Sequence, residues 1–191
     1  MLLEFAVVDS TNTIAWQLVD QGYGDGTVIV AKRQTAGRGQ WGRKWESEPG
    51  GLYLSLIYVP KVRIIDPGII TIGTVWGIAH QLQAFVPGLR IKPPNDLYVG
   101  KCKLGGILTE ARWHHQQISV AVIGVGINGW NSAPQGAISL QDLQTNISNL
   151  EQLRELTVAG INLGKTRWEQ PDTKALQQDY QELVTSNNVV F

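Results

Sequence analysis

The chain contains 191 residues, 43% of them hydrophobic, and its 16 Lys and Arg balance 16 Asp and Glu. This length suits one globular unit with a sizeable core, and the zero net charge excludes a global attraction to nucleic acid or to membranes. The single cysteine, Cys102, excludes an internal disulfide and a cysteine-based zinc site, which points to a reducing compartment. The first residues lack a basic start, and no segment approaches about twenty apolar residues, so we expect a soluble, cytoplasmic protein.

The first half of the chain alternates between helix and strand patterns. Apolar residues at helical spacing over residues 14–19, behind a run of capping residues, predict a short helix. Residues 27–31 and 52–59 read as buried strands, and a glycine-rich basic loop at 34–51 separates them. Apolar positions three to four apart predict a longer helix over 69–85.

The second half adds shorter strands and then helices. Residues 89–92 predict a strand that two prolines end, and residues 103–110 and 118–125 predict two more strands joined by a turn. Residues 150–163 and 173–183 have helical patterns. We therefore expect an α+β fold, with a mixed, mostly antiparallel sheet backed by helices on one face.

The strongest local signal is a glycine-rich basic run at residues 34–45, QTAGRGQWGRKW. Glycines let backbone N–H groups approach a ligand closely, while Arg38, Arg43 and Lys44 supply cations, so this loop is a candidate anion site. It lacks the ending of a Walker A loop, and no helix pattern follows as in a dinucleotide fingerprint. On residue types alone, a solvated basic surface loop explains the run equally well.

Three further features of the sequence each have two interpretations. Asn95 and Asp96 either hold a metal-bound nucleotide or form an Asx turn after proline. Lys103, followed by glycines in its strand, either reaches into a pocket or is a solvated edge charge. The glycines at 124 and 126 either border a ligand or allow close packing.

The order of the motifs is more informative than any one of them. In chain order they are Asp-Ser-Thr-Asn (9–12), Gly-Arg-Gly-x-x-Gly-Arg-x-Trp (37–45), Pro-Asn-Asp-Leu (94–97), Lys-Leu-x-Gly-Ile-Leu (103–108) and Gly-x-Gly-Ile-Asn (124–128). This series resembles the catalytic domain of biotin protein ligases over roughly residues 5–130. The resemblance implies the biotin–lipoate ligase fold, which is similar to that of class II aminoacyl-tRNA synthetases.

The resemblance also implies a domain organisation. We expect a catalytic domain over residues 1–165 and a helical appendage, or a stub of the family's C-terminal domain, over 166–191. Because the first helix is predicted within a few residues of the first position, we expect the DNA-binding domain of the regulatory members to be absent.

Site residues follow from the resemblance by motif position. The residues expected to bind biotin are Ser10, Thr11, Gln34, Gly37, Arg38, Lys103, Gly106, Leu108, Gly124 and Gly126. Those expected to bind ATP are Arg38, Arg43, Trp45, Asn95, Asp96 and Asn128. Lys103, Arg38 and Asp96 are the expected catalytic residues, with Mg²⁺ held at Asp96 through the nucleotide. Trp45 either packs over the adenine or anchors the loop.

The implied activity is ATP-dependent biotinylation of a lysine through a biotinyl-5′-AMP intermediate. The implied partner is a biotin carboxyl carrier protein or domain of a carboxylase, and the resemblance allows a homodimer through a sheet edge, without nucleic acid or membrane. Two positions depart from the family pattern: Gln40 stands where the family commonly has an arginine, and Pro93 stands where it usually has a tryptophan. Two alternatives remain: a lipoate or octanoate ligase or transferase, and a biotin-binding module without catalysis.

Overall fold

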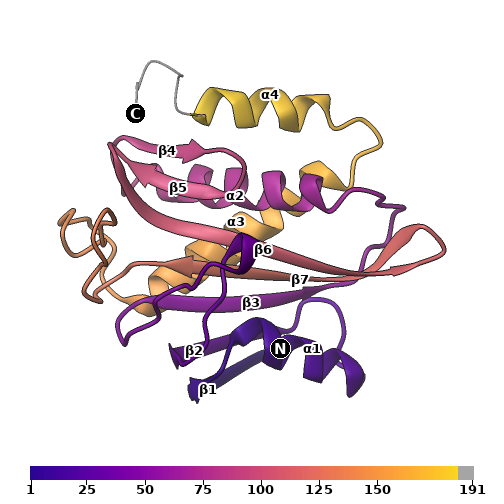
Figure 1. Cartoon of the computed structure of the whole chain (residues 1–191). Coiled ribbons are helices and arrows are strands. Elements are labelled where there is room, and N and C mark those ends of the chain that lie inside the picture. The colour runs from indigo at the N-terminus through magenta and orange to yellow at the C-terminus, as the bar shows by residue number, and fades with distance from the viewer. Residues whose placement is uncertain (185–191) are drawn as a thin grey trace.

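Seven strands form one mixed sheet, which the computed structural model describes together with four α-helices over residues 1–184 (Figure 1). The strands are β1 (Leu2–Val8), β2 (Val28–Gln34), β3 (Leu52–Tyr58), β4 (Leu89–Lys92), β5 (Asp96–Val99), β6 (Cys102–His114) and β7 (Gln117–Ile127). Their order across the sheet is β1-β2-β3-β7-β6-β5-β4, with β1 parallel to β2 and every other neighbouring pair antiparallel. The predicted fold class is confirmed.

The helices cover both faces of the sheet rather than one. α2 (Pro67–Leu82), α3 (Leu150–Trp168) and α4 (Lys174–Leu183) pack on one face, whereas α1 (Thr11–Asp20) lies on the other against β2, β3 and β7. The expectation that helices back one face only was therefore wrong. Alternation along β3 explains the two cores, because Leu54 and Leu56 join the cluster beneath α2 while Ile57 joins the smaller cluster beneath α1.

Glycines allow α2 and α3 to approach each other closely. A Cβ atom added at Gly77 would collide with the backbone oxygen of Gly160, and one added at Gly164 would collide with that of Gly73. Both helices therefore present two glycines four residues apart at their contact, where any larger side chain would separate the backbones.

Two strands were not predicted. β1 is an edge strand with exposed side chains at Leu2 and Val7, and among residues 1–184 its only partner is the non-local, parallel strand β2. β5 begins at Asp96, inside the motif that was interpreted as a turn, and pairs with β4 and β6. β1 depends on a partner that is distant in sequence, whereas β5 pairs with its chain neighbours and was missed because the prolines and the Asn-Asp pair before it indicate a turn.

The C-terminal helices belong to the same core as the sheet. α3 runs through residue 165 to Trp168, and the side chains of Trp168, Leu176 and Tyr180 are buried in the cluster beneath α2. A division at residue 165 stays a prediction, and residues 185–191 of the expected appendage lie outside the described residues. Within residues 1–184, no helix combines the length and the apolar character needed to cross a membrane.

Candidate functional site

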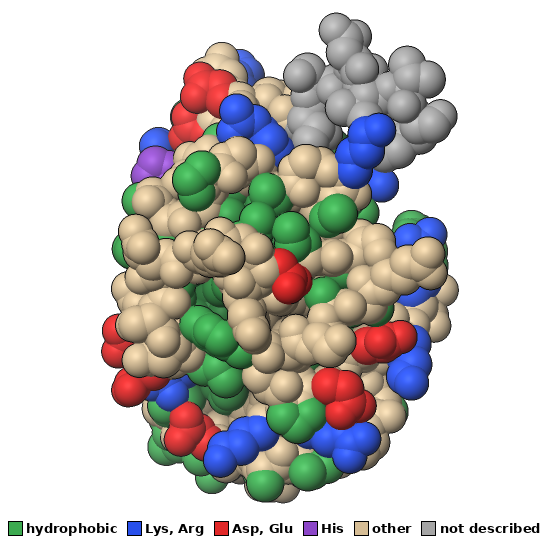
Figure 2. Space-filling view, turned by 90° about the vertical axis from the view of Figure 1, so that its left-hand side faces the viewer, with side chains coloured by type: hydrophobic (Ala, Val, Ile, Leu, Met, Phe, Trp, Pro, Cys, Tyr) green, Lys and Arg blue, Asp and Glu red, His purple; other side chains and the backbone are tan. Residues whose placement is uncertain are grey.

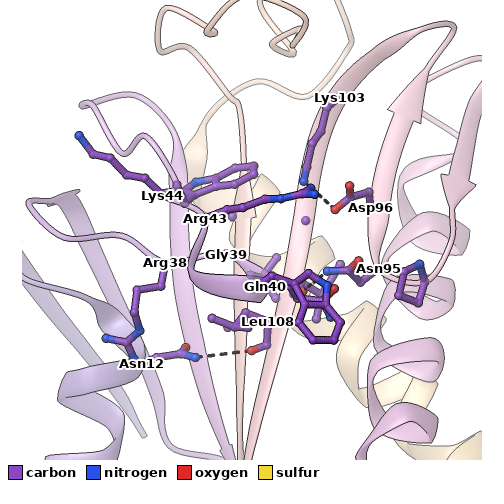
Figure 3. Close-up of a pocket in the computed structure, with 18 of the residues that line it drawn as sticks. Asn12, Arg38, Gly39, Gln40, Arg43, Lys44, Asn95, Asp96, Lys103 and Leu108 are labelled. Carbon is purple, nitrogen blue, oxygen red and sulfur yellow. Dashed lines mark hydrogen bonds and ion pairs between the residues drawn. The ribbon is translucent and has the colours of Figure 1, made fainter. Parts of the chain in front are cut away.

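A cavity of about 500 Å³ opens on the face of the sheet that carries α1. Its walls come from the start of α1, the loop between β2 and β3 (residues 35–51, the basic loop), the segment from Lys92 to Asp96, the first half of β6 and the end of β7 (Figure 3). The lining residues are Ser10, Thr11, Asn12, Gln34, Arg38, Gly39, Gln40, Trp41, Arg43, Lys44, Trp45, Lys92, Pro93, Pro94, Asn95, Asp96, Tyr98, Lys103, Gly106, Ile107, Leu108, Gly124, Val125 and Gly126. The motifs that are far apart in sequence therefore meet at one cavity.

The cavity is strongly basic although the chain as a whole is neutral. Five cationic side chains and one carboxylate line it, the carboxylate being that of Asp96. On the molecular face in Figure 2, by contrast, basic and acidic side chains are interspersed among the described residues. Such a local excess of positive charge in a concave site favours an anionic ligand.

Lys103 and Asp96 form the charged centre of this cavity. The Lys103 ammonium lies 2.7 Å from Asp96 Oδ1, and both side chains are largely buried. It also lies 5.2 Å from the centre of the Trp45 ring. Arg43 extends from the basic loop toward this pair, whereas Lys44 points away from it (Figure 3). The interpretation of Lys103 as a solvated edge charge is thus wrong, because its ammonium reaches into the cavity.

The backbone around Lys103 is held by the segment that follows β7. Lys103 N donates to Gly136 O at 3.1 Å, and Ile138 N donates to Lys103 O at 3.0 Å. Asn128 completes this contact, because its amide donates to Ile138 O at 3.3 Å and its Oδ1 accepts from Asn131 at 3.2 Å. Asn128 is 2% exposed and does not line the cavity, so the expectation that it faces a nucleotide is corrected.

A neutral polar wall stands at the α1 end of the cavity. Gln34 Oε1 accepts from Thr11 N at 2.8 Å, and Gln34 Nε2 donates to Ser47 Oγ at 2.8 Å. Ser55, fully buried in β3, donates from its hydroxyl to Asn12 Oδ1 at 2.6 Å. Hydroxyls and amides of this kind can both donate to and accept from a neutral ligand group such as a urea.

Two glycines of β7 make room for side chains that lie flat on the sheet. A Cβ at Gly124 would collide with the Asn12 amide, and one at Gly126 would collide with the indole of Trp45. Both glycines also line the cavity. They therefore allow close packing and border the cavity at the same time, which are the two interpretations that the sequence left open. The Trp45 indole thereby becomes part of the cavity wall, with a buried Nε1 that has no hydrogen-bond partner.

The basic loop folds back on itself beside the cavity. Trp45 N donates to Gly37 O at 2.9 Å. Gly37 was expected to lie in the biotin site, but it is buried against Trp45 and Ser47 and does not line the cavity. At the tip, Trp41 has a φ of 59° and is 91% exposed. At the far end, the Tyr53 hydroxyl donates to Glu48 O at 2.6 Å, and burial raises the pKa of this phenol.

Apart from Gly37 and Asn128, the structure brings every residue of the expected site to the cavity. The lining residues that were not assigned to biotin or ATP are Asn12, Gly39, Gln40, Trp41, Lys44, Lys92, Pro93, Pro94, Tyr98, Ile107 and Val125. Asn12 had a signal, since it ends the Asp-Ser-Thr-Asn motif, but it was interpreted only as a helix-capping residue. Ser55 also gave a signal in the sequence, because it is the one small polar residue among the apolar and tyrosine residues of β3.

No group of three or more His, Cys, Asp or Glu side chains within residues 1–184 is placed to hold a metal ion. Asp96 alone supplies a carboxylate to the cavity lining. This donor set fits Mg²⁺ that arrives bound to phosphates, because such Mg²⁺ takes only one or two carboxylates from protein.

Comparisons with known proteins agree with this geometry. The model of the biotin/lipoate A/B protein ligase family matches residues 4–128. The bifunctional ligase/repressor BirA of Bacillus spizizenii is 32% identical over 145 residues, which cover 74% of this chain and 44% of the relative. The biotin–[acetyl-CoA-carboxylase] ligase of Paracoccus denitrificans is 29% identical over 136 residues, 70% of this chain and 56% of the relative.

A solved structure of the biotin protein ligase from Aquifex aeolicus, in complex with biotin and ATP, superposes with a TM-score of 0.77 at 25% identity. The match covers 96% of this chain and 78% of that one. The chain spans about half the length of the curated relatives it matches.

Proposed function

The chain belongs to the biotin/lipoate A/B protein ligase family, and on this premise we propose that it activates biotin with ATP and attaches it to a carrier-protein lysine. The observation that carries the proposal is the combination of three surfaces in one cavity. The neutral wall at Thr11 and Gln34 suits a ureido ring, the floor at Leu108 suits an aliphatic chain, and the basic end suits a carboxylate beside phosphates. Similarity to ligases of biotin, including one solved with biotin and ATP, supports this choice.

The proposed chemistry begins with two anions that repel each other. A carboxylate oxygen of biotin forms a bond to the α-phosphorus of ATP, the bond from that phosphorus to the bridging oxygen breaks, and pyrophosphate leaves. Lys103 would neutralise the carboxylate, and Arg43, which extends toward Lys103, would meet the phosphates. Mg²⁺ held at Asp96 would supply further neutralisation of the phosphate charge.

The second proposed step transfers the acyl group. The carrier lysine, as a free amine, attacks the acyl carbon of biotinyl-5′-AMP, AMP leaves as the carbon–oxygen bond breaks, and the new amide nitrogen loses one proton to water. Because a mixed anhydride hydrolyses readily, water must be kept away from it. The basic loop, which supplies Gln40, Trp41 and Arg43 to one wall of the cavity, is the segment placed to do this.

The carrier and the location are the less direct parts of the proposal. The name of the Paracoccus relative specifies acetyl-CoA carboxylase, which supports a carboxylase carrier domain as the acceptor. The lone Cys102 suits a reducing, cytoplasmic compartment. A homodimer through a sheet edge stays a prediction.

Exchange of labelled pyrophosphate into ATP tests the first step. We expect exchange that depends on added biotin, because adenylation is reversible. Exchange with lipoate or octanoate alone would move the substrate to the lipoate branch of the family. Biotin binding by calorimetry without any exchange would leave a binding module and would contradict ligase activity.

Gln40→Arg is expected to slow the loss of the intermediate. One added cation on the basic loop would attract the adenylate phosphate, and an exposed ion pair contributes up to about 1 kcal/mol, which corresponds to roughly fivefold slower hydrolysis of bound biotinyl-5′-AMP. Hydrolysis is measured by single-turnover release of AMP in the absence of carrier. Gln178→Arg, on the exposed face of α4, adds the same charge away from the cavity and should leave the rate unchanged. Equal rates for Gln40→Arg and the unmodified chain would contradict the expectation.

A further inference from the structure

A single carboxylate just beyond the cavity lining joins three donors from different segments. The oxygens of Glu110 accept from Asn12 Nδ2 at 3.1 Å, from Trp16 Nε1 at 2.9 Å and from Arg38 Nη2 at 3.2 Å. Asn12 and Arg38 both line the cavity, whereas Glu110 does not. Nothing in the sequence motifs assigned a role to this residue.

The strand register explains why Glu110 faces this side. Successive residues of β6 point to opposite faces, so Glu110 lies on the face of Leu108, which lines the cavity. The intervening Thr109 faces the other way, where its hydroxyl bonds Thr71 of α2 at 2.8 Å. Glu110 is thus held in the ladder between β6 and β7, opposite Val122, while Arg38 belongs to a loop.

Glu110 sets the position of the Arg38 guanidinium. Arg38 Nη1 donates to Thr13 Oγ1 at 2.8 Å while Nη2 donates to Glu110, so the guanidinium is held at two points. Figure 3 shows the side chain directed toward Asn12 and away from the Lys103–Asp96 pair. Because a guanidinium has five donor hydrogens, contacts remain available to a ligand while this position is kept.

Glu110 also sets which way the Asn12 amide faces. Asn12 Oδ1 can only accept, and it is used by the Ser55 hydroxyl at 2.6 Å. The Nδ2 group must therefore donate on the opposite side, where Glu110 Oε2 is its nearest acceptor. Removing that acceptor would leave the Nδ2 group with only the longer contact to Leu108 O at 3.5 Å.

We infer that Glu110 is a positioning residue of the site, which fixes Arg38 and Asn12 at the α1 end of the cavity so that the Arg38 guanidinium meets the anionic ligand in one orientation. The identity of that ligand, biotin with ATP, rests on the proposed function. The positioning itself rests on the contacts of Glu110 alone.

The variant Glu110→Gln separates these roles. Its amide oxygen still accepts from Asn12 and Trp16, but its NH₂ group faces the donors of Arg38, so the Arg38 contact is selectively lost. Loss of a partly exposed charge-assisted contact is expected to lower kcat/KM for ATP in the exchange assay by about tenfold.

Arg112→Gln is the matched control. Arg112 lies two residues further along the same face of β6, and pairs with Asp20 at the end of α1, away from the cavity. If Glu110 only tethered α1 to β6, both variants would behave alike. We expect Arg112→Gln to keep full exchange activity, with the two variants showing similar urea unfolding.

A double-mutant cycle tests whether Glu110 acts through Arg38. In an Arg38→Gln background, adding Glu110→Gln should lower kcat/KM by less than twofold, because the contact is already gone. A further tenfold loss in that background would overturn the inference.

A second measurement does not depend on catalysis. The side-chain N–H resonances of Arg38 in an NMR spectrum are assigned by their absence in Arg38→Gln. The hydrogens of these groups should exchange slowly with water in the unmodified chain and in Arg112→Gln, and rapidly in Glu110→Gln. Slow hydrogen exchange with water in Glu110→Gln would overturn the inference, whatever the pyrophosphate-exchange activity of that variant. If the unmodified chain shows no biotin-dependent exchange, the proposed function fails, and the resonances still decide the role of Glu110.

Discussion

Lys103→Ala is expected to reduce biotin-dependent pyrophosphate exchange by roughly a hundred- to a thousandfold, the range found when one fixed charge-stabilising donor is removed from an active site. The ammonium is the cation at the centre of the cavity, 2.7 Å from Asp96. Its removal leaves the Asp96 carboxylate without its partner and directed at an anionic ligand. The exchange rate at saturating biotin and ATP measures the effect.

Lys101→Ala provides the matched control for this variant. Lys101 is exposed in the turn before β6, two residues from Lys103, and does not line the cavity. It removes the same charge from the same segment, so exchange should stay within twofold of the unmodified chain. Full activity in Lys103→Ala would remove Lys103 from the proposed mechanism.

Gly160→Ala is expected to lower the free energy of unfolding by about 3 kcal/mol, at the upper end of what overpacking costs. The added methyl group would collide with the backbone of Ile78 and Gly77 at the contact between α2 and α3. Intrinsic helix propensity alone would favour alanine by about 1 kcal/mol, so the sign of the change is diagnostic. Urea unfolding followed by circular dichroism measures it.

Asn162→Ala serves as the control on the exposed face of α3. It raises helix propensity without approaching α2 and should change stability by less than about 0.5 kcal/mol. A stabilised Gly160→Ala protein would show that the two helices can separate at no cost.

The parts of the fold that the sequence predicted are those with strong local pattern. The spacing of apolar residues in α2 and the prolines that end β4 are local features, and both elements lie where they were expected. β1 escaped prediction because its side chains are mostly exposed and its parallel partner begins more than twenty residues later. The contact of α2 with α3 depends on glycines, which carry no periodic signal of their own.

The site shows the same division between local motif and spatial arrangement. The residues of the glycine-rich run and of the Pro-Asn-Asp motif could be named because several motifs occurred in one order. Asn128 was misplaced because a motif gives the position of a residue but not the direction of its side chain, which the buried amide contacts determine here. Glu110 could not be found, since its three partners come together only in the folded sheet.

Alternation along β7 assigns neighbouring residues to opposite faces of the sheet. Along β7, Ile123 and Ile127 belong to the core beneath α2, while the intervening Gly124 and Gly126 face the cavity. The glycines are constrained from the cavity side, because a Cβ atom at either would collide with Asn12 or Trp45, whereas the isoleucines are constrained by the core. The shape of the cavity and the packing of the core are thus controlled from opposite faces of one strand.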